Sequence, residues 1–314
     1  MTTLGQLGER QIIDRLVERL GTHSNVVCGP GDDAAVVRIA ADARVDLVLT
    51  SDAVLEGRHF TAGAHPGAVG RKAVARALSD LAAMGSNPQW VLIDIVAPAT
   101  FDVAAIETVY EGATSIAEEH GVVIIGGDTA EGSPFGMHVF AVGTVSRDAA
   151  IYRSGASQGD MLFVTGSLGG SSLGSHLAFD PRIREGVWLG DWASSMIDLS
   201  DGLATDLRHI ANKSDVGFVI KQQNIPISEH ARTLDDKHSG FMHALRDGED
   251  YELLFTVPEA RVSAFKTAWA GSFDLECSQI GVATAKAKQI EIESPGGEIT
   301  LLDDEGYEHF GPRE

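Results

Sequence analysis

The sequence predicts an α/β protein with two domains. Short apolar runs rich in β-branched residues alternate with segments whose apolar residues recur every three or four positions, as strands and amphipathic helices do. The chain has 314 residues, more than one hydrophobic core usually organises, and 44% of them are hydrophobic. Its 35 glycines and 6% aromatic residues suit many tight turns between strands and helices.

The first half of the chain alternates predicted strands with two long predicted helices, near 70–84 and 103–119. Spacing of Ile12, Leu16 and Leu20 predicts an amphipathic helix at the N-terminus instead of a signal peptide. The apolar runs that predict strands are AAVVRI (34–39), VDLVLTSD (45–52), QWVLIDIV (89–96), GVVIIGGD (121–128) and MHVFAVGTV (137–145).

A polar stretch, SRDAAIYRSGASQGD (146–160), interrupts this pattern and predicts a domain junction. We therefore divide the chain into domains at 1–148 and 149–314. The second half repeats the alternation, with strand DMLFVTG (160–166), a strand and helix in SSMIDLSDGLATDLRHIA (194–211), strand DYELLFTV (250–257) and a helix near 259–269.

Net charge and cysteine content exclude several classes of binding partner and site. Asp and Glu number 45 against 24 Lys and Arg, a net charge of −21, which disfavours nucleic acid and anionic membranes. An acidic protein that handles phosphates needs divalent cations to supply positive charge. Cys28 and Cys277 form no C-x-x-C motif, and the longest apolar stretch, WVLIDIVAP, is too short to span a bilayer. We expect a cytoplasmic protein.

Aspartates stand at the ends of several predicted strands. Asp52 ends VDLVLTSD, Asp128 ends GVVIIGGD, and Asp198 and Asp201 lie in SSMIDLSD, whereas Asp33 precedes a strand. Carboxylates at strand ends of an α/β sheet project toward the crevice where such folds bind ligands. With the hydroxyls of TSD and LSD and the glycines of GGDT, they make a set of oxygen ligands typical of Mg²⁺.

Each aspartate also has a structural interpretation that the sequence leaves open. Asp32 and Asp33 suit a turn after a Pro-Gly pair. Asp201 suits the N-cap of the helix that follows it. Asp80 lies in the helix RKAVARALSDLAAMG, off its buried stripe and four residues after Arg76, so a surface ion pair would account for it.

Familiar nucleotide and nucleophile motifs are absent from the sequence. Gly29, Gly31 and Ala34 fit the dinucleotide fingerprint, but Asp32 and Asp33 stand where the pyrophosphate would lie. Neither a P-loop nor a G-x-S-x-G elbow occurs. The basic side chains available for a phosphate clamp near the acidic segments are Arg58, His59, Arg71, Lys72 and Arg153.

Taken together, nine segments resemble the thiamine-monophosphate kinase family, of the superfamily that includes aminoimidazole ribonucleotide synthetase and selenophosphate synthetase. They follow the family order from residue 29 to residue 311: GPGDDAAVV, TSDAVLEGRHF, GRKAVARALSDLAAMG, GGDTAEG, RSGASQGD, LFVTGSLGG, IDLSDGLATDL, GEDYELLFT and GYEHFG. The resemblance implies an N-terminal α/β domain with a mixed sheet through which the protein forms a homodimer, and a C-terminal α/β domain.

The implied reaction moves the γ-phosphoryl group of the co-substrate ATP to thiamine monophosphate, giving thiamine diphosphate and ADP. Several Mg²⁺ ions would assist direct in-line transfer, so no protein nucleophile is implied, and Asp52 and Asp128 would act through the metals. Asp33 would then meet phosphate through magnesium. In GGDTAEG, Ala130 and Glu131 depart from the family, which often has a hydroxyl and a basic residue there.

Matched position by position, the resemblance implies three sets of residues. The magnesium ligands would be Asp33, Thr50, Ser51, Asp52, Asp80, Asp128, Asp198 and Asp201. The residues contacting ATP would be Tyr110, Gly127, Asp128, Arg153 and Ser200. Thiamine monophosphate would be held by His59, by Glu249 in preference to Asp250, and by Tyr307 flanking a ring.

Two other functions compete with this hypothesis. The first is an ATP-dependent synthetase acting on another acceptor. The predicted acceptor segments favour thiamine monophosphate over this alternative; they are EGRHF, GEDYELLF and GYEHF. The second is a nucleotide or metal sensor without catalysis. The complete set of acidic residues argues against this alternative.

Overall fold

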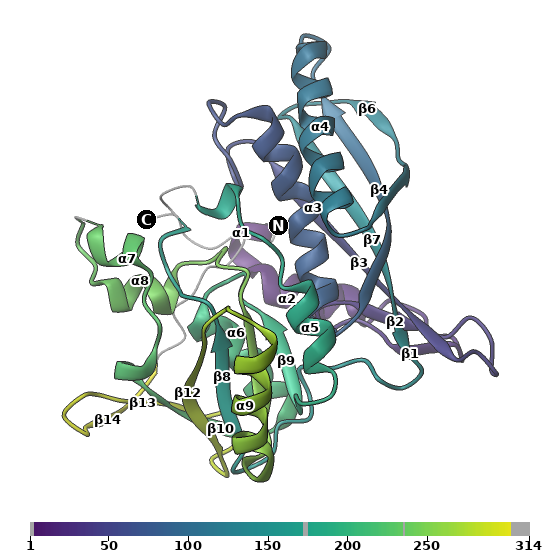
Figure 1. Cartoon of the computed structure of the whole chain (residues 1–314). Helices are drawn as coiled ribbons and strands as arrows, with labels where there is room; N and C mark the ends of the chain where they lie inside the picture. Colours follow the sequence, from purple (N-terminus) through teal and green to yellow (C-terminus); the bar gives the residue numbers. More distant parts are fainter. Residues whose placement is uncertain (1–2, 172–174, 235, 303–314) are drawn as a thin grey trace.

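The computed structural model describes residues 3–171, 175–234 and 236–302 (Figure 1). These residues form two β-sheets, each packed against helices, so the expected α/β fold is confirmed. Among them, no helix is both long and apolar enough to cross a membrane.

The N-terminal sheet is mixed, as the family resemblance implies. Its strand order is β1-β2-β3-β7-β4-β5, with β6 beside β4; β7 runs antiparallel to β3 and β4, whereas β5 runs parallel to β4. The strands are β1 (Val26–Cys28), β2 (Ala35–Val37), β3 (Val45–Leu55), β4 (Asn87–Ala97), β5 (Val123–Gly126), β6 (Thr129–Glu131) and β7 (Gly136–Ser146).

Two helices cover one face of this sheet, α3 (Pro66–Ala83) and α4 (Val103–Glu119) (Figure 1). Each begins at a side-chain cap, because His65 and Asp102 accept backbone N–H groups of the first turn. Strand alternation buries one row of β4 side chains under the helices and leaves the other row, which includes Trp90 and Leu92, exposed on the outer face.

The C-terminal sheet has the order β14-β13-β10-β12-β8-β11-β9. Its strands are β8 (Met161–Thr165), β9 (Ser195–Asp198), β10 (Gly217–Lys221), β11 (Leu253–Val257), β12 (Cys277–Thr284), β13 (Ile290–Glu293) and β14 (Ile299–Leu301). The helices of this half are α5 (Ile183–Leu189), α6 (Leu203–Ser214), α7 (Glu229–Thr233), α8 (Gly240–Arg246) and α9 (Val262–Ser272).

The hydrophobic core connects the two sheets. One cluster of buried side chains runs from the helix-covered face of the N-terminal sheet, through α3, to the face of the C-terminal sheet that carries α9. A second cluster fills the opposite face of the C-terminal sheet, under α6. Helix α3 contacts β3, α5 and β9, so its side chains reach both halves of the molecule.

Two details differ from the sequence expectations. The N-terminal helices are α1 (Leu4–Leu7) and α2 (Glu9–Val17), so Leu20, which the spacing placed in the amphipathic helix, lies beyond the end of α2 and is exposed. The N-cap of α6 is Gly202, with φ 98°, so the interpretation of Asp201 as the cap is wrong.

Candidate active site

Three aspartates from separate elements meet between the sheets. Asp33 precedes β2, Asp80 lies on α3, and Asp198 ends β9; one carboxylate oxygen from each lies within 4.8 Å of the others. Asp33 also forms an ion pair with Arg153 at 2.7 Å. The structure therefore brings together three acids that are far apart in the sequence.

Neighbouring hydroxyls hold two of these carboxylates in place. Thr50 Oγ1 donates to Asp80 Oδ2 at 2.5 Å, and Ser79 Oγ donates to Asp198 Oδ2 at 2.6 Å. Asp80 therefore faces the interior. The alternative of a surface ion pair with Arg76 is wrong, because α3 is largely buried between the sheets.

Arg76 instead binds Asp52, with Nε and Nη2 each donating at 3.0 Å. Its Nη1 lies 3.8 Å from Glu249 Oε1. A planar guanidinium suits such a two-point bond to a carboxylate. Arg76 thus connects the predicted metal ligand Asp52 to the predicted substrate residue Glu249.

Crowding of carboxylates raises their pKa values. Burial, and then the charge of Asp198, raises the pKa of Asp80 well above its usual range. Burial, and then Asp33, raises the pKa of Asp198 to about 7. Asp33 Oδ2 is buried, and no donor among the described residues bonds it. Three converging carboxylates with an orphaned oxygen fit a hard divalent cation such as Mg²⁺.

We expect this cluster to make the metal-free protein more stable at pH 6 than at pH 8. A raised folded-state pKa means that the folded chain binds more protons than the unfolded chain, so stability falls as pH rises through about 7. Asp198 alone would contribute about 1 kcal/mol over this range. Urea unfolding in EDTA measures the difference, and Asp198→Asn should reduce it; an unchanged pH dependence in that variant contradicts the assignment.

The structure does not bring the predicted metal ligands Ser51, Asp128 and Asp201 into this cluster. The Asp201 backbone N–H donates to the buried carboxylate of Asp206, an acid that the sequence interpretation overlooked although it stands in SDGLATD. Ser51 is exposed on the outer face of the sheet, opposite in direction to Thr50. Asp128 is exposed in the turn after β5 and lies outside the three-acid cluster.

The residues expected to contact ATP come from both halves. Gly127 has φ 156°, and a Cβ there would lie 1.8 Å from the Ile93 carbonyl oxygen, so only glycine fits. Arg153 donates hydrogen bonds to two acids: its guanidinium donates to Asp33 and its backbone N–H donates to Asp32. Ser200, half-buried, accepts the Glu249 N–H through its carbonyl. Burial raises the pKa of Tyr110, which is half-buried on α4.

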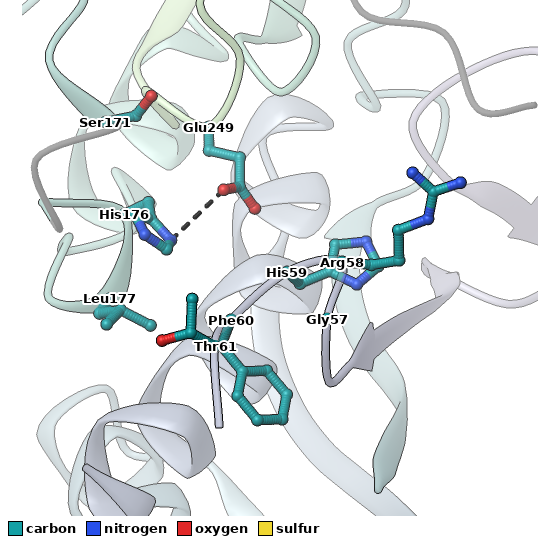
Figure 2. A pocket seen from close by; sticks show the side chains of 9 residues that line it. All are labelled: Gly57, Arg58, His59, Phe60, Thr61, Ser171, His176, Leu177 and Glu249. Carbon is teal, nitrogen blue, oxygen red and sulfur yellow. Dashed lines mark ion pairs between the residues drawn. The ribbon is translucent and has the colours of Figure 1, made fainter. Parts of the chain in front are cut away.

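A cavity of about 300 Å³ contains two of the predicted substrate residues, His59 and Glu249 (Figure 2). Its other lining residues are Gly57, Arg58, Phe60, Thr61, Ser171, His176 and Leu177. Asp250 instead lines a neighbouring cavity of about 270 Å³, and its carboxylate accepts the Gly169 N–H. Tyr307 lies outside the described residues.

Buried Lys72 stands behind the first cavity. Its Nζ donates to the His59 carbonyl at 2.6 Å and contacts Glu249 Oε1 at 2.6 Å and His176 Nδ1 at 2.7 Å. Lys72 was one of several basic candidates in the sequence. His176 was overlooked, because no motif surrounds it.

Known proteins resemble both halves of the chain. The model of the AIR synthase related protein, N-terminal domain, matches residues 31–145, and that of the C-terminal domain matches residues 170–292. The thiamine-monophosphate kinase of Escherichia coli strain K12 is 35% identical over 325 residues, covering 96% of this chain and 98% of that protein.

Solved structures agree with these matches. AaThiL complexed with AMPPCP and TMP has a TM-score of 0.84 at 29% identity, covering 98% of this chain and 99% of that chain. Thiamine-monophosphate kinase from Stenotrophomonas maltophilia K279a has a TM-score of 0.75 at 33% identity, covering 91% and 96%. The chain therefore belongs to the thiamine-monophosphate kinase family.

Proposed function

We propose that this protein is an enzyme that transfers the terminal phosphoryl group of ATP to thiamine monophosphate, forming thiamine diphosphate and ADP. The observation that carries the proposal is the link from Asp52, whose carboxylate charge acts on Asp80 of the acidic cluster, to the cavity, because Arg76 contacts both Asp52 and Glu249. The similar structure AaThiL holds AMPPCP, an ATP analogue, together with TMP. A phosphoryl donor beside the acids and an acceptor in the cavity would meet at Arg76.

Magnesium is proposed to bind at the acidic cluster. Asp33, Asp80 and Asp198 supply the convergent oxygens, and Asp52 lies at the end of the Arg76 bridge. By family resemblance, the further ligands proposed are Thr50, Ser51, Asp128 and Asp201. Several Mg²⁺ ions bound there would supply positive charge to the β- and γ-phosphate oxygens of ATP.

The proposed binding residues follow the same division. ATP would contact Tyr110, Gly127, Asp128, Arg153 and Ser200. Thiamine monophosphate would contact His59 and Glu249, which share one cavity. Asp250 is the weaker proposal, because the Gly169 N–H already occupies its carboxylate.

The proposed transfer is direct and in line. An oxygen of the thiamine phosphate bonds to the γ-phosphorus, while the bond from that phosphorus to the bridging oxygen breaks and its electrons leave with ADP. The acceptor is already ionised near neutral pH, so no strong general base is required. Arg76, which contacts both Asp52 and Glu249, would place a fixed positive charge between the two proposed binding sites.

We further propose a homodimer formed through the outer face of the N-terminal sheet. Trp90 and Leu92 on β4, Val123 and Ile125 on β5, and Phe140 on β7 are all at least 39% exposed. Strand pairing aligns Leu92 with Phe140 and Trp90 with Val123 on this face. A second copy would cover this apolar surface. The division at residue 148 and a cytoplasmic location remain predictions from the sequence.

The function is tested by incubating the protein with ATP, Mg²⁺ and thiamine monophosphate and measuring ADP and thiamine diphosphate. Product should require both the metal and the monophosphate, so EDTA or free thiamine in place of the monophosphate should abolish it. ADP formed only with another acceptor would contradict the proposed substrate. Nucleotide binding without turnover would favour the sensor alternative.

A further inference from the structure

The walls of the substrate cavity are tied together by one buried cation. The loop at 57–61, the 3₁₀ turn Ser175–Leu177 and Glu249 come from distant parts of the chain. Lys72 contacts one residue of each, namely the His59 carbonyl, His176 and Glu249. An ammonium group has three N–H donors, and these contacts satisfy all three.

This geometry determines the protonation of His176. Lys72 forms an ion pair with Glu249 at 2.6 Å, and the ammonium of this pair donates and cannot accept, so Nδ1 of His176, 2.7 Å from Nζ, is the acceptor. The neutral ring then carries its proton on Nε2. Burial, and then the charge of Lys72, lowers the pKa of His176 below its usual value, in agreement with a neutral ring.

The Nε2 edge is opposite the edge that Lys72 and Glu249 engage. The side chain of His176 is 18% exposed and lines the cavity with His59 and Glu249 (Figure 2). Glu249 presents Oε1 to Lys72, and its Oε2 lies 3.3 Å from His176 Nδ1. The cavity thus combines a fixed N–H donor with a carboxylate whose charge is balanced by Lys72.

We propose that His176 is a further substrate-binding residue, which donates its Nε2–H to thiamine monophosphate, and that Lys72 is the positioning residue that keeps Nε2 protonated. The inference rests on the proposed function for the identity of the substrate. Thiamine monophosphate offers two kinds of hydrogen-bond acceptor, the ring nitrogens of its aminopyrimidine and its phosphate oxygens. Both accept from a neutral imidazole N–H.

Three substitutions separate donation to the substrate from support of Lys72. His176→Phe removes both nitrogens. His176→Asn keeps an acceptor near the position of Nδ1 for Lys72 but removes the donor, whereas His176→Gln places an amide N–H near the position of Nε2. His23→Phe, in the exposed segment before β1, is the control.

The Phe and Asn variants should each raise KM for thiamine monophosphate about tenfold, as expected for the loss of one hydrogen bond. The Gln variant should recover most of the loss, and KM for ATP should stay within about twofold of the unsubstituted protein. Wild-type kinetics in His176→Asn, or an equal rise in KM for ATP, would overturn the proposal.

Inhibition by free thiamine identifies the acceptor atom. If His176→Phe weakens thiamine inhibition as much as it raises KM, the bond goes to the pyrimidine; if only KM rises, the bond goes to the phosphate. Either result supports the proposal. If His176→Phe changes neither KM nor inhibition by thiamine, the proposal is contradicted.

Nitrogen-15 NMR of the histidine rings, assigned by comparison with His176→Gln, tests the part played by Lys72 without turnover. The expected spectrum has Nε2 protonated and Nδ1 unprotonated between pH 6 and 8, and protonation on Nδ1 would overturn it. Failure of the wild-type protein to make thiamine diphosphate would refute the proposed function, while this spectrum would still decide the state of His176.

Discussion

Substitution of Asp80 by asparagine is expected to abolish phosphoryl transfer and, in the absence of metal, to stabilise the fold. Asp80 meets Asp33 and Asp198 in the three-acid cluster, so its charge would be needed to hold the proposed Mg²⁺. Asparagine keeps an oxygen that can accept from Thr50 but removes the negative charge. We expect kcat to fall by at least about a thousandfold, since metal-borne charge stabilisation is the main catalytic contribution in this chemistry.

The gain in stability has the same cause as the loss of activity. In the metal-free protein, burial and neighbouring carboxylates make the ionised form of Asp80 unfavourable and therefore raise its pKa. Replacement should raise the free energy of unfolding by about 1 to 2 kcal/mol, or the melting temperature by a few degrees. Added Mg²⁺ should then stabilise the wild-type protein more than the variant.

Calorimetry with and without Mg²⁺, beside the turnover assay, measures both effects. Asp42→Asn is a matched control, because Asp42 is an exposed aspartate outside the three-acid cluster and is expected to change neither quantity. An Asp80→Asn protein that keeps a tenth of its activity, or that melts below the wild type without metal, would contradict the assignment of Asp80.

Local sequence patterns predicted most elements but not their contacts. The predicted helix at 103–119 is α4 (Val103–Glu119), because an apolar stripe against a sheet leaves a clear period of 3.6 residues. The strands around 45–52 and 89–96 were found for a similar reason, although both extend further than predicted. Such patterns depend on neighbours within one element, which the sequence displays directly.

The environment of α3 shows that such patterns do not predict contacts between elements. Spacing of four residues suggested that Arg76 and Asp80 pair on an exposed helix surface, but α3 is enclosed by both halves of the molecule. Arg76 therefore turns to Asp52 on the neighbouring strand, and Asp80 to acids more than 45 residues away in the chain. Only the packing of the two sheets on α3 decides these partners. The proposed role of His176 could not be predicted from the sequence for the same reason, because it depends on the contact with Lys72 on α3.

Substitution of Phe140 by glutamate is expected to convert the proposed homodimer into a monomer. Phe140 lies in the middle of the outer sheet face, paired with Ser51 on β3 and with Leu92 on β4, and it is 40% exposed in the single chain. Association would bury this side chain, and an ionised carboxylate in its place would lose its hydration without a partner charge. A cost of about 4 kcal/mol or more corresponds to a thousandfold or greater rise in the dissociation constant.

Light scattering after size-exclusion chromatography would detect this change as a halved molar mass. Leu301→Glu is the matched control, because Leu301 is an exposed apolar residue on β14 of the other sheet and lies apart from the proposed interface. The variant at Phe140 should still bind Mg²⁺, because the acidic cluster forms within one chain on the opposite side of the sheet. Dissociation in the Leu301 variant, or a persistent dimer in the Phe140 variant, would place the interface elsewhere, and a monomeric wild type would refute the homodimer itself.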